Sequence, residues 1–283
     1  MDIKTVMVIG AGQMGAGIAQ ICAQSGYKVY VNDIDEALVN KGFDRISKSL
    51  SRQVARARMT EGEKVLIFDQ LFKSTDLQHA QYADVVIEAA IENMDIKKNI
   101  FAELDKYAPE HAILATNTSS LPITEIAAAT TRPEKVIGMH FMNPVPAMKL
   151  VEIIRGLVTA DGVYQDIEEM ALNLNKTPVE VNDFPGFVSN RILMPMINEA
   201  VYTLYEGVAT KESVDRVLKL GVNHPMGPLE LADFIGLDTC LYIMETLHEG
   251  FGDDKYRPCP LLRKYVKAGW LGRKSGRGFY FYD

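Results

Sequence analysis

The apolar positions of the first 183 residues follow two alternating patterns. Short runs rich in Val, Ile and other apolar residues predict buried strands, and apolar residues three or four positions apart predict helices between them. The predicted strands are residues 5–9, 28–32, 83–89, 112–116, 135–141, 150–155 and 177–182, and the predicted helices are residues 14–26, 35–58, 96–104, 122–129 and 162–175. Strands that alternate with helices form βαβ units, so we expect an α/β fold with a doubly wound, mostly parallel sheet.

The strand pattern stops after Asp183. From there on, apolar residues recur only at helical spacing, in segments separated by turns that contain Gly and Pro. The predicted helices are residues 187–205, 211–220, 228–249 and 260–269. We place a domain boundary near Phe184-Pro185-Gly186, between an α/β domain of residues 1–183 and an all-helical domain of residues 184–283.

Composition narrows the class of protein. The 283 residues are 47% hydrophobic and 24% charged, which is ordinary for a globular protein and excludes a disordered chain. The net charge of −7 argues against binding nucleic acid through overall charge. No stretch reaches the roughly 18 apolar residues that a membrane span requires.

The cysteines and the N-terminal residues give further expectations about metal sites and cellular location. Cys22, Cys240 and Cys259 are too few and too scattered for a disulfide framework or a zinc cluster, so we expect no metal site. The chain enters its first predicted strand within a few residues and has no basic segment before it, unlike a signal or transit peptide. We therefore expect a cytoplasmic protein that binds neither nucleic acid nor membrane.

A glycine-rich motif follows the first predicted strand and opens the first predicted helix. Its residues are Gly10, Ala11, Gly12, Gln13, Met14 and Gly15. In the Rossmann fold such glycines permit a tight turn and let the backbone approach a pyrophosphate. Asp33, after the second strand, is placed to bind a ribose 2′-hydroxyl and to repel a 2′-phosphate, so the motif predicts NAD rather than NADP. The alternative is a glycine-rich turn beside a surface Asp, or a mononucleotide site.

Histidine is the first candidate for the proton transfer that accompanies hydride exchange at an alcohol or ketone. Among the five histidines, His140 ends a predicted parallel strand, at the edge of the sheet where such folds bind ligands. His79, His111 and His248 are more typical of solvated or structural residues, and His224, in a turn with Pro and Gly, is ambiguous. From the residues alone, a catalytic His140 and a buried structural histidine are equally good interpretations.

Longer segments carry a more specific pattern. They are VIGAGQMGAGIAQ, VIEAAIEN, TNTSSLPI, GMHFMNPVPAMKLVEII, DFPGFVSNRILMPMINEA and LGRKSGRGFY, which follow one another over almost the whole chain. Together they resemble the 3-hydroxyacyl-CoA dehydrogenase family, and in length most of all its short-chain bacterial 3-hydroxybutyryl-CoA members. The resemblance implies an NAD-dependent oxidoreductase of fatty-acid and butanoate metabolism that interconverts (S)-3-hydroxybutyryl-CoA and acetoacetyl-CoA.

The resemblance also implies four catalytic residues. His140 in MHFMNP and Glu152 in KLVEI would form a dyad, in which the carboxylate accepts the second imidazole N–H and fixes the tautomer. Ser119 in NTSS and Asn190 in VSNR would contact the acyl part of the substrate. On their own, Ser119 and Asn190 are equally typical of a helix cap and a solvated helix residue.

The resemblance implies further contacts with the cofactor. Glu92 and Lys97 in IENMDIKK, and Lys274 in GRKSG, match the residues that contact the nicotinamide side and the ribose in the family. Asn143 follows His140 by three residues, and we expect it near the nicotinamide or the substrate. A Glu or Lys after a strand is otherwise usually exposed to solvent.

Charge is unevenly distributed along the chain. Residues 41–64 hold seven basic side chains and three acidic ones, although the whole chain is acidic. Lys48, Arg52 and Arg56 are four positions apart and share one helix face, where like charges repel without a counter-ion. We therefore expect this face to bind the 3′-phosphate-ADP part of coenzyme A; the alternative is a solvated basic face.

The helical domain has more apolar positions than one layer of helices requires, which favours subunit association. The positions are Leu193, Met194, Ile197, Val201, Leu237, Leu241, Ile243 and Met244. The family resemblance likewise implies a homodimer through this domain, or a higher oligomer.

Two other functions remain open. One is a β-hydroxyacid dehydrogenase, which shares the two-domain plan but uses a lysine of the helical domain as acid and base. The other is a non-catalytic relative that keeps only nucleotide binding, as a lens crystallin of the family does. The pattern of MHFMNP followed by Glu152 argues against the first, and the presence of Ser119, His140, Glu152 and Asn190 argues against the second.

Overall fold

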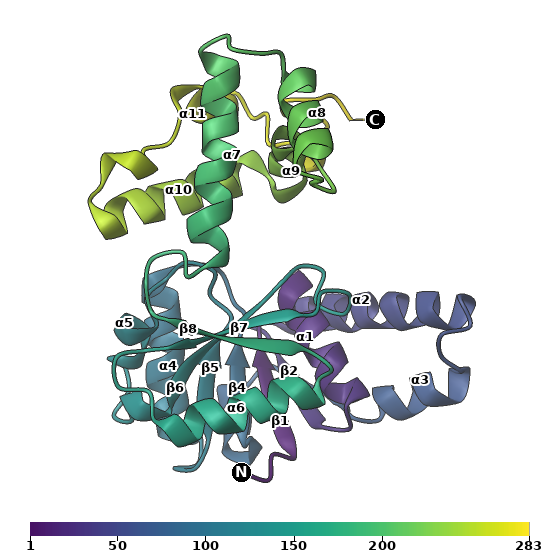
Figure 1. Cartoon of the computed structure of the whole chain (residues 1–283). Coiled ribbons are helices and arrows are strands. Elements are labelled where there is room, and N and C mark those ends of the chain that lie inside the picture. The colour runs from purple at the N-terminus through teal and green to yellow at the C-terminus, as the bar shows by residue number, and fades with distance from the viewer. Residues whose placement is uncertain (283) are drawn as a thin grey trace. The chain divides into compact units, whose positions relative to one another are not determined.

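Eight strands form a single sheet in the N-terminal part of the chain (Figure 1), and the computed structural model describes residues 1–282. The strand order is β3-β2-β1-β4-β5-β6-β7-β8. The strands are β1 (Thr5–Ile9), β2 (Lys28–Asn32), β3 (Leu71–Ser74), β4 (Val85–Glu88), β5 (Ile113–Thr116), β6 (Val136–Phe141), β7 (Leu150–Arg155) and β8 (Thr177–Asn182). Neighbours are parallel except β6 and β7, which run antiparallel. The predicted α/β class is confirmed.

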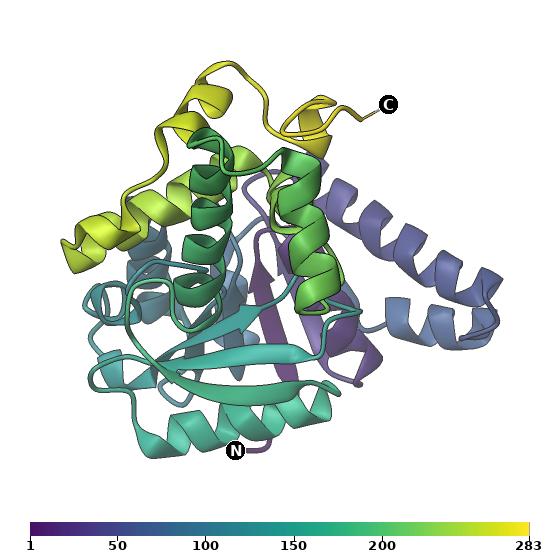
Figure 2. The same cartoon turned by 45° about the horizontal axis from the view of Figure 1, so that its top comes forward.

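Helices cover both faces of the sheet. They are α1 (Gln13–Gln24), α2 (Glu36–Ala55), α3 (Glu61–Phe68), α4 (Met94–Tyr107), α5 (Ile123–Ala127) and α6 (Asp161–Asn173). On one face, strand residues such as Val8 and Met139 share a buried core with Ile18 of α1 and Ile167 of α6. Helices α4 and α5 lie on the other face. Figures 1 and 2 show α2 and α3 extending past the edge of the sheet.

Two of these elements, β3 and α3, were missed by the sequence prediction. β3 is an edge strand in which only the first and last residues are buried, so it has no apolar run to reveal it. In α3 only Ile67 is buried. The signal for this helix is the capping box of Thr60 and Glu63, which lies outside the hydrophobic pattern.

Residues beyond Asp183 form a second compact unit, Phe184–Asp283, which is helical. Its helices are α7 (Ser189–Tyr205), α8 (Lys211–Gly221), α9 (Pro228–Ile235), α10 (Leu237–Phe251) and α11 (Pro260–Lys267). Helix α7 contacts all four others, with α8 on one side and α10 and α11 on the other (Figure 2). None of the helices within residues 1–282 is both long and apolar enough to cross a membrane.

The single helix predicted over residues 228–249 is wrong, because the chain breaks at Gly236 between α9 and α10. Gly236 has φ of +105°, a conformation that L side chains rarely adopt. The apolar periodicity continues across the break, so it did not reveal the interruption.

Most apolar residues expected to form surplus surface on the helical unit belong to its own core. Met194, Ile197 and Leu237, for example, are at most 1% exposed. Other apolar side chains face solvent instead. They are each more than half exposed and include Ile192, Val208, Val217 and Leu220.

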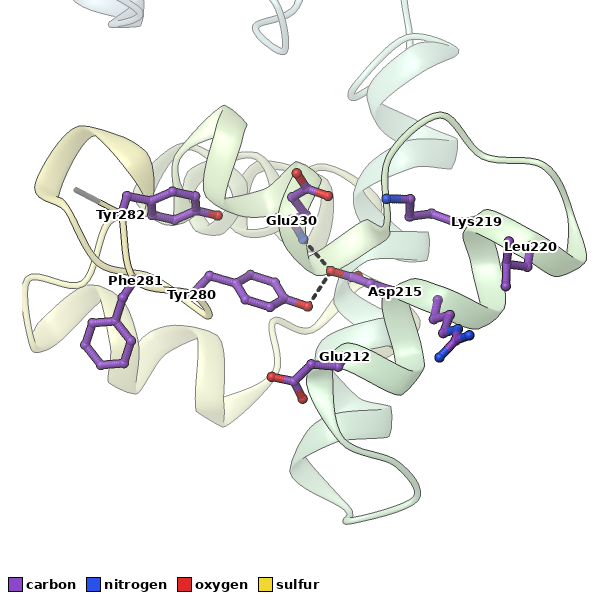
Figure 3. A pocket seen from close by; sticks show the side chains of 9 residues that line it. Glu212, Asp215, Lys219, Leu220, Glu230, Tyr280, Phe281 and Tyr282 are labelled. Carbon is purple, nitrogen blue, oxygen red and sulfur yellow. Dashed lines mark hydrogen bonds between the residues drawn. The ribbon is translucent and has the colours of Figure 1, made fainter.

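Two buried carboxylates fasten the C-terminal tail to the helical unit. Asp233 in α9 accepts hydrogen bonds from the backbone N–H groups of Phe279 and Tyr280, and Asp215 in α8 accepts one from the Tyr280 hydroxyl at 2.7 Å. A cavity of about 650 Å³ lies beside them, lined by α8, α9 and residues 280–282 (Figure 3). Asp215 also accepts two backbone N–H groups at the start of α9. Asp215, one of the carboxylates that line the cavity, thus stabilises the fold.

Candidate active site

The glycine-rich turn between β1 and α1 is required by packing. Gly10 has φ of +94°, and a Cβ there would lie 2.5 Å from the carbonyl oxygen of Ala89. A Cβ on Gly15 would lie 1.7 Å from the carbonyl oxygen of Gly10. A Cβ on Gly12, in contrast, would meet no protein atom within 4 Å. Gly10 and Gly15 therefore bring backbone against backbone, while Gly12 borders open space.

The start of α1 and the end of β2 fit a dinucleotide. The backbone N–H groups at the N-terminus of α1 present positive partial charge to an anion. The first turn of the helix holds no acidic side chain that would repel the anion. Asp33 follows β2, and its carboxylate accepts hydrogen bonds from the N–H groups of Ala11 (2.7 Å) and Ile34 (2.8 Å). A pyrophosphate beside Gly12 and a ribose diol beside Asp33 match these groups, as in NAD-binding Rossmann folds.

His140 and Glu152 are brought together by the pairing of β6 with β7. The two residues are opposite each other in the antiparallel register. His140 Nδ1 lies 2.7 Å from Glu152 Oε2, and the two residues are 7% and 2% exposed. Their neighbours along the strands, such as Met139 and Ile153, belong to the core under α1 and α6. Because side chains alternate along a strand, the His140–Glu152 pair faces the side of the sheet covered by α4 and α5.

Ser119 belongs to a turn that follows β5, next to β6 in the sheet. Glu92 holds this turn, because its Oε1 accepts hydrogen bonds from the hydroxyl of Thr118 (2.6 Å) and from the backbone N–H groups of Ser119 (2.9 Å) and Ser120 (3.2 Å). The hydroxyls of Ser119 and Ser120 are also within 3.3 Å of the same oxygen. Glu92 is thus close to Ser119, and Lys97 lies 3.3 Å from the other oxygen of Glu92.

Other expected residues are distributed over both units. Gln13 donates a hydrogen bond from Nε2 to Oδ1 of Asn143 at 2.9 Å, which links the start of α1 to the loop after His140. Asn190 lies in the first turn of α7 and is 8% exposed. Lys274, in the tail of the helical unit, forms an ion pair with Asp238 at 2.6 Å.

The basic face of α2 borders a pocket on the same unit as the glycine-rich turn. The pocket has a volume of about 360 Å³, and Lys48 and Arg52 line it together with Arg45, Gln13 and residues of the loop after β6. Arg56 follows the last residue of α2 and lies outside this lining. All three predicted basic residues are exposed. The expected positive surface therefore adjoins the start of α1.

The cysteine thiols are poor nucleophiles. All three cysteines are unpaired and buried, and burial raises the pKa of Cys22 and of Cys240 to about 12. Both thiols therefore stay protonated at neutral pH. Within residues 1–282, no group of three or more His, Cys, Asp and Glu side chains is placed to hold a metal ion.

Sequence reasoning missed Glu88, a charged residue inside the buried end of β4. It forms an ion pair with Lys97, and Lys97 is 1% exposed, although a lysine after a strand is usually solvated. The available signal was a Glu at the end of an apolar run, in ADVVIEA, which on its own is also typical of a strand that has reached the surface.

Comparison with known sequences identifies the family. The family model described as the NAD binding domain of 3-hydroxyacyl-CoA dehydrogenase matches residues 5–184, and the model described as its C-terminal domain matches residues 186–282. A probable 3-hydroxybutyryl-CoA dehydrogenase of Bacillus subtilis is 61% identical over 100% of this chain and 99% of its own length. The 3-hydroxybutyryl-CoA dehydrogenase of Bradyrhizobium diazoefficiens is 54% identical over 99% of this chain and 96% of its own.

A solved structure agrees with these matches. The crystal structure of (S)-3-hydroxybutyryl-CoA dehydrogenase from Ralstonia eutropha has a TM-score of 0.97 and 50% identity, and the match covers all of both chains. The resemblance found in the sequence segments is confirmed. This chain belongs to the 3-hydroxyacyl-CoA dehydrogenase family, whose N-terminal domain binds NAD.

Proposed function

We propose that this protein is an NAD-dependent dehydrogenase that interconverts (S)-3-hydroxybutyryl-CoA and acetoacetyl-CoA. The observation that carries the proposal is the buried His140–Glu152 pair, in a chain of this family that also has a dinucleotide-binding turn. The substrate is named after relatives 54–61% identical that are called 3-hydroxybutyryl-CoA dehydrogenases. In this assignment residues 1–183 form the NAD-binding domain, and the helical unit contributes to the substrate site and to dimerisation.

His140 moves the proton in the proposed reaction. Because Nδ1 faces Glu152, the proton exchanged with the substrate oxygen is held at Nε2. Glu152 fixes the tautomer and stabilises the imidazolium that forms when His140 takes the proton. The nicotinamide, when bound, supplies or accepts the hydride at C3 of the acyl group. His140 acts as the base in alcohol oxidation and as the acid in ketone reduction.

The cofactor site proposed here combines the turn, the acidic residue after β2 and several side chains at the nicotinamide end. Its members are Gly10, Ala11, Gly12, Gln13, Met14, Gly15, Asp33, Glu92, Lys97, Asn143 and Lys274. The position of Asp33 favours NAD over NADP, because its carboxylate would repel a 2′-phosphate.

The substrate site has an acyl part and a coenzyme A part. Ser119 and Asn190 are proposed to bind the acyl portion, and the Asn190 amide can donate a hydrogen bond to an oxygen that gains negative charge. Lys48, Arg52 and Arg56 are proposed to bind the phosphates of coenzyme A. The pocket lined by Lys48 and Arg52 supports this proposal, and Arg56 would act from outside it.

We also propose a cytoplasmic homodimer formed through the helical unit. Helix α8 has two apolar side chains that face solvent, Val217 (64% exposed) and Leu220 (75% exposed). Val208, in the turn before α8, is 71% exposed. An apolar groove of about 450 Å³ between α7 and α8 continues this surface. Apolar patches of this kind on a single chain are typical of subunit interfaces.

A substrate comparison tests the proposed function. We expect acetoacetyl-CoA to be reduced with NADH far faster than with NADPH, and acetoacetyl-pantetheine to show a higher KM than acetoacetyl-CoA because it lacks the phosphates. The measurement is kcat/KM for each pair, followed by absorbance of the reduced cofactor. Turnover of free 3-hydroxy acids alone would favour a β-hydroxyacid dehydrogenase, and no turnover with either cofactor would favour the non-catalytic alternative.

A further inference from the structure

Glu88 is a buried anion that has no direct route to a ligand. It ends β4 with 0% of its surface exposed, and Lys97 in α4 is 1% exposed. Both oxygens of Glu88 accept hydrogen bonds from Lys97 Nζ, at 2.7 and 2.9 Å. Each oxygen accepts one more, from the N–H of Ala90 and from the hydroxyl of Thr116, both at 2.7 Å. Charges so deeply buried are costly unless paired, so the retention of this pair needs a reason.

Lys97 joins Glu88 to Glu92. Its Nζ is 2.7 Å and 2.9 Å from the two oxygens of Glu88 and 3.3 Å from Oε2 of Glu92. An ammonium has three N–H donors, and these three carboxylate oxygens are enough to accept all of them. The position of the Lys97 ammonium between the two carboxylates therefore depends on the negative charge of Glu88.

Glu92 in turn divides its two oxygens between Lys97 and the turn that carries Ser119. Oε2 faces Lys97, while Oε1 accepts the hydrogen bonds of Thr118, Ser119 and Ser120 described above. A chain of contacts thus leads from the interior of the sheet at Glu88 to the backbone and hydroxyl of Ser119.

We propose that Glu88 is a positioning residue, which acts through Lys97 and Glu92 to hold the Ser119 hydroxyl where the acyl group is bound. The role of Ser119 rests on the proposed function, and Glu88 itself touches neither substrate nor cofactor. The charge of Glu88 keeps the Lys97 ammonium at the inner side of Glu92. Without that charge, Lys97 draws both oxygens of Glu92 toward itself, and the turn of Thr118, Ser119 and Ser120 loses its acceptor.

The first test measures the turn and needs no enzyme activity. In Glu88→Gln, we expect faster amide hydrogen exchange at Ser119 and Ser120, because their N–H groups lose Glu92 as an acceptor. Removing the ammonium as well, in Glu88→Gln/Lys97→Met, leaves Glu92 with the turn and should return the exchange toward that of the wild type. Glu103→Gln, which breaks an exposed ion pair with Lys106 on the same helix, is the matched control and should leave exchange in the turn unchanged.

The outcome at the turn decides the structural half of the proposal. Unchanged exchange in a folded Glu88→Gln protein would overturn it. If Glu88→Gln fails to fold, Glu88→Gln/Lys97→Met takes its place, because this variant removes both charges of the buried pair. Amide exchange in the turn much faster than in the wild type would then overturn the proposal. Exchange close to that of the wild type would support it.

The second test asks whether the effect on catalysis passes through Ser119. We expect Glu88→Gln to lower kcat about tenfold at saturating NADH, because a small displacement of a substrate-binding group is costly in rate. In a Ser119→Ala background, the same change should lower kcat by no more than about twofold, since the group it positions is gone. A general loss of structure would instead lower kcat by the same factor in both backgrounds.

These results separate the two proposals. A wild-type protein that does not reduce acetoacetyl-CoA would refute the proposed function, while hydrogen exchange would still report on the coupling of Glu88 to the turn. An active wild type with equal losses in both backgrounds would refute the role of Glu88 and leave the dehydrogenase function intact.

Discussion

His140 is held by the backbone as much as by its carboxylate partner. The register of β6 and β7 places His140 opposite Glu152, so the 2.7 Å contact between Nδ1 and Oε2 follows from sheet pairing rather than from a mobile loop. A ring fixed in this way needs little reorganisation to move a proton. Burial of both residues also keeps bulk water from competing for the same hydrogen bond.

Replacing His140 with Gln tests this arrangement. We expect kcat to fall by on the order of 10²- to 10⁴-fold, because the amide cannot exchange a proton, while the dissociation constant for NADH changes little. Stopped-flow turnover and quenching of protein fluorescence by NADH measure the two quantities. His111→Gln, at an exposed histidine paired with Asp84, is the matched control and should retain full turnover. A His140→Gln enzyme with near wild-type turnover would refute the proposed acid–base role.

The end of helix α4 shows how one side chain can complete an element. The Arg132 guanidinium donates hydrogen bonds to the backbone carbonyls of Asp105, Ala108 and Pro109 and to the Asp105 carboxylate. The last carbonyls of a helix have no partners within the helix, so Arg132 supplies them. Burial favours a higher pKa for Asp105, but hydrogen bonds from Thr131 and Arg132 outweigh it and hold that pKa below its ordinary value.

Arg132→Lys should therefore destabilise the α/β unit. An ammonium cannot reach three carbonyls and a carboxylate at once, and we expect a loss of about 1–3 kcal/mol at neutral pH. Asp105 has a lowered folded-state pKa, so its contribution to stability is present above the ordinary pKa of an Asp and disappears as the pH falls through the folded-state pKa. The difference between variant and wild type should accordingly shrink in acid. Urea denaturation at neutral and acid pH measures it, with the exposed Arg58→Lys as control; a constant difference would contradict the role of Asp105.

Elements with an apolar run could be predicted from the sequence, and elements without one could not. The seven longer stretches of alternating or continuous apolar residues became strands of the sheet, including His140 at the end of β6. The edge strand β3 was not predicted because only two of its residues are buried, which gives no periodic pattern. The break at Gly236 was not predicted because it depends on a backbone angle, which apolar periodicity does not report. Glu88, and the burial of Lys97, were not predicted for a different reason. Their burial depends on α4 crossing the end of β4, which is a tertiary contact that no local pattern contains.

At the scale of the whole chain, acidic and basic regions are separated. The net charge of −7 includes the basic helix α2, whose exposed face adjoins the start of α1. A positive face on a chain of net negative charge orients an anionic ligand as it approaches, an effect that weakens with salt. The net charge alone therefore does not exclude an anionic ligand at this face.

The apolar face of the helical unit gives a prediction about assembly. We expect a mass near twice 31.5 kDa at micromolar concentration, and Val217→Asp should shift it toward the monomer because a charge would be buried in the interface. Light scattering after gel filtration measures the mass. Val179→Asp makes the same change at an exposed valine of β8 and should leave the dimer intact. A wild-type protein that elutes as a monomer would refute the proposed dimer.

The antiparallel pairing of β6 and β7 has a consequence for how this protein can change during evolution. The two strands are joined by residues 142–149, which lie outside the sheet ladder. Insertions there can lengthen the connection without moving His140 away from Glu152. One residue added or removed within β7 itself would turn every later side chain of the strand to the opposite face. Variation in length is therefore tolerated in the connection and forbidden in the strand, although both lie within a few residues of the proton-transfer site.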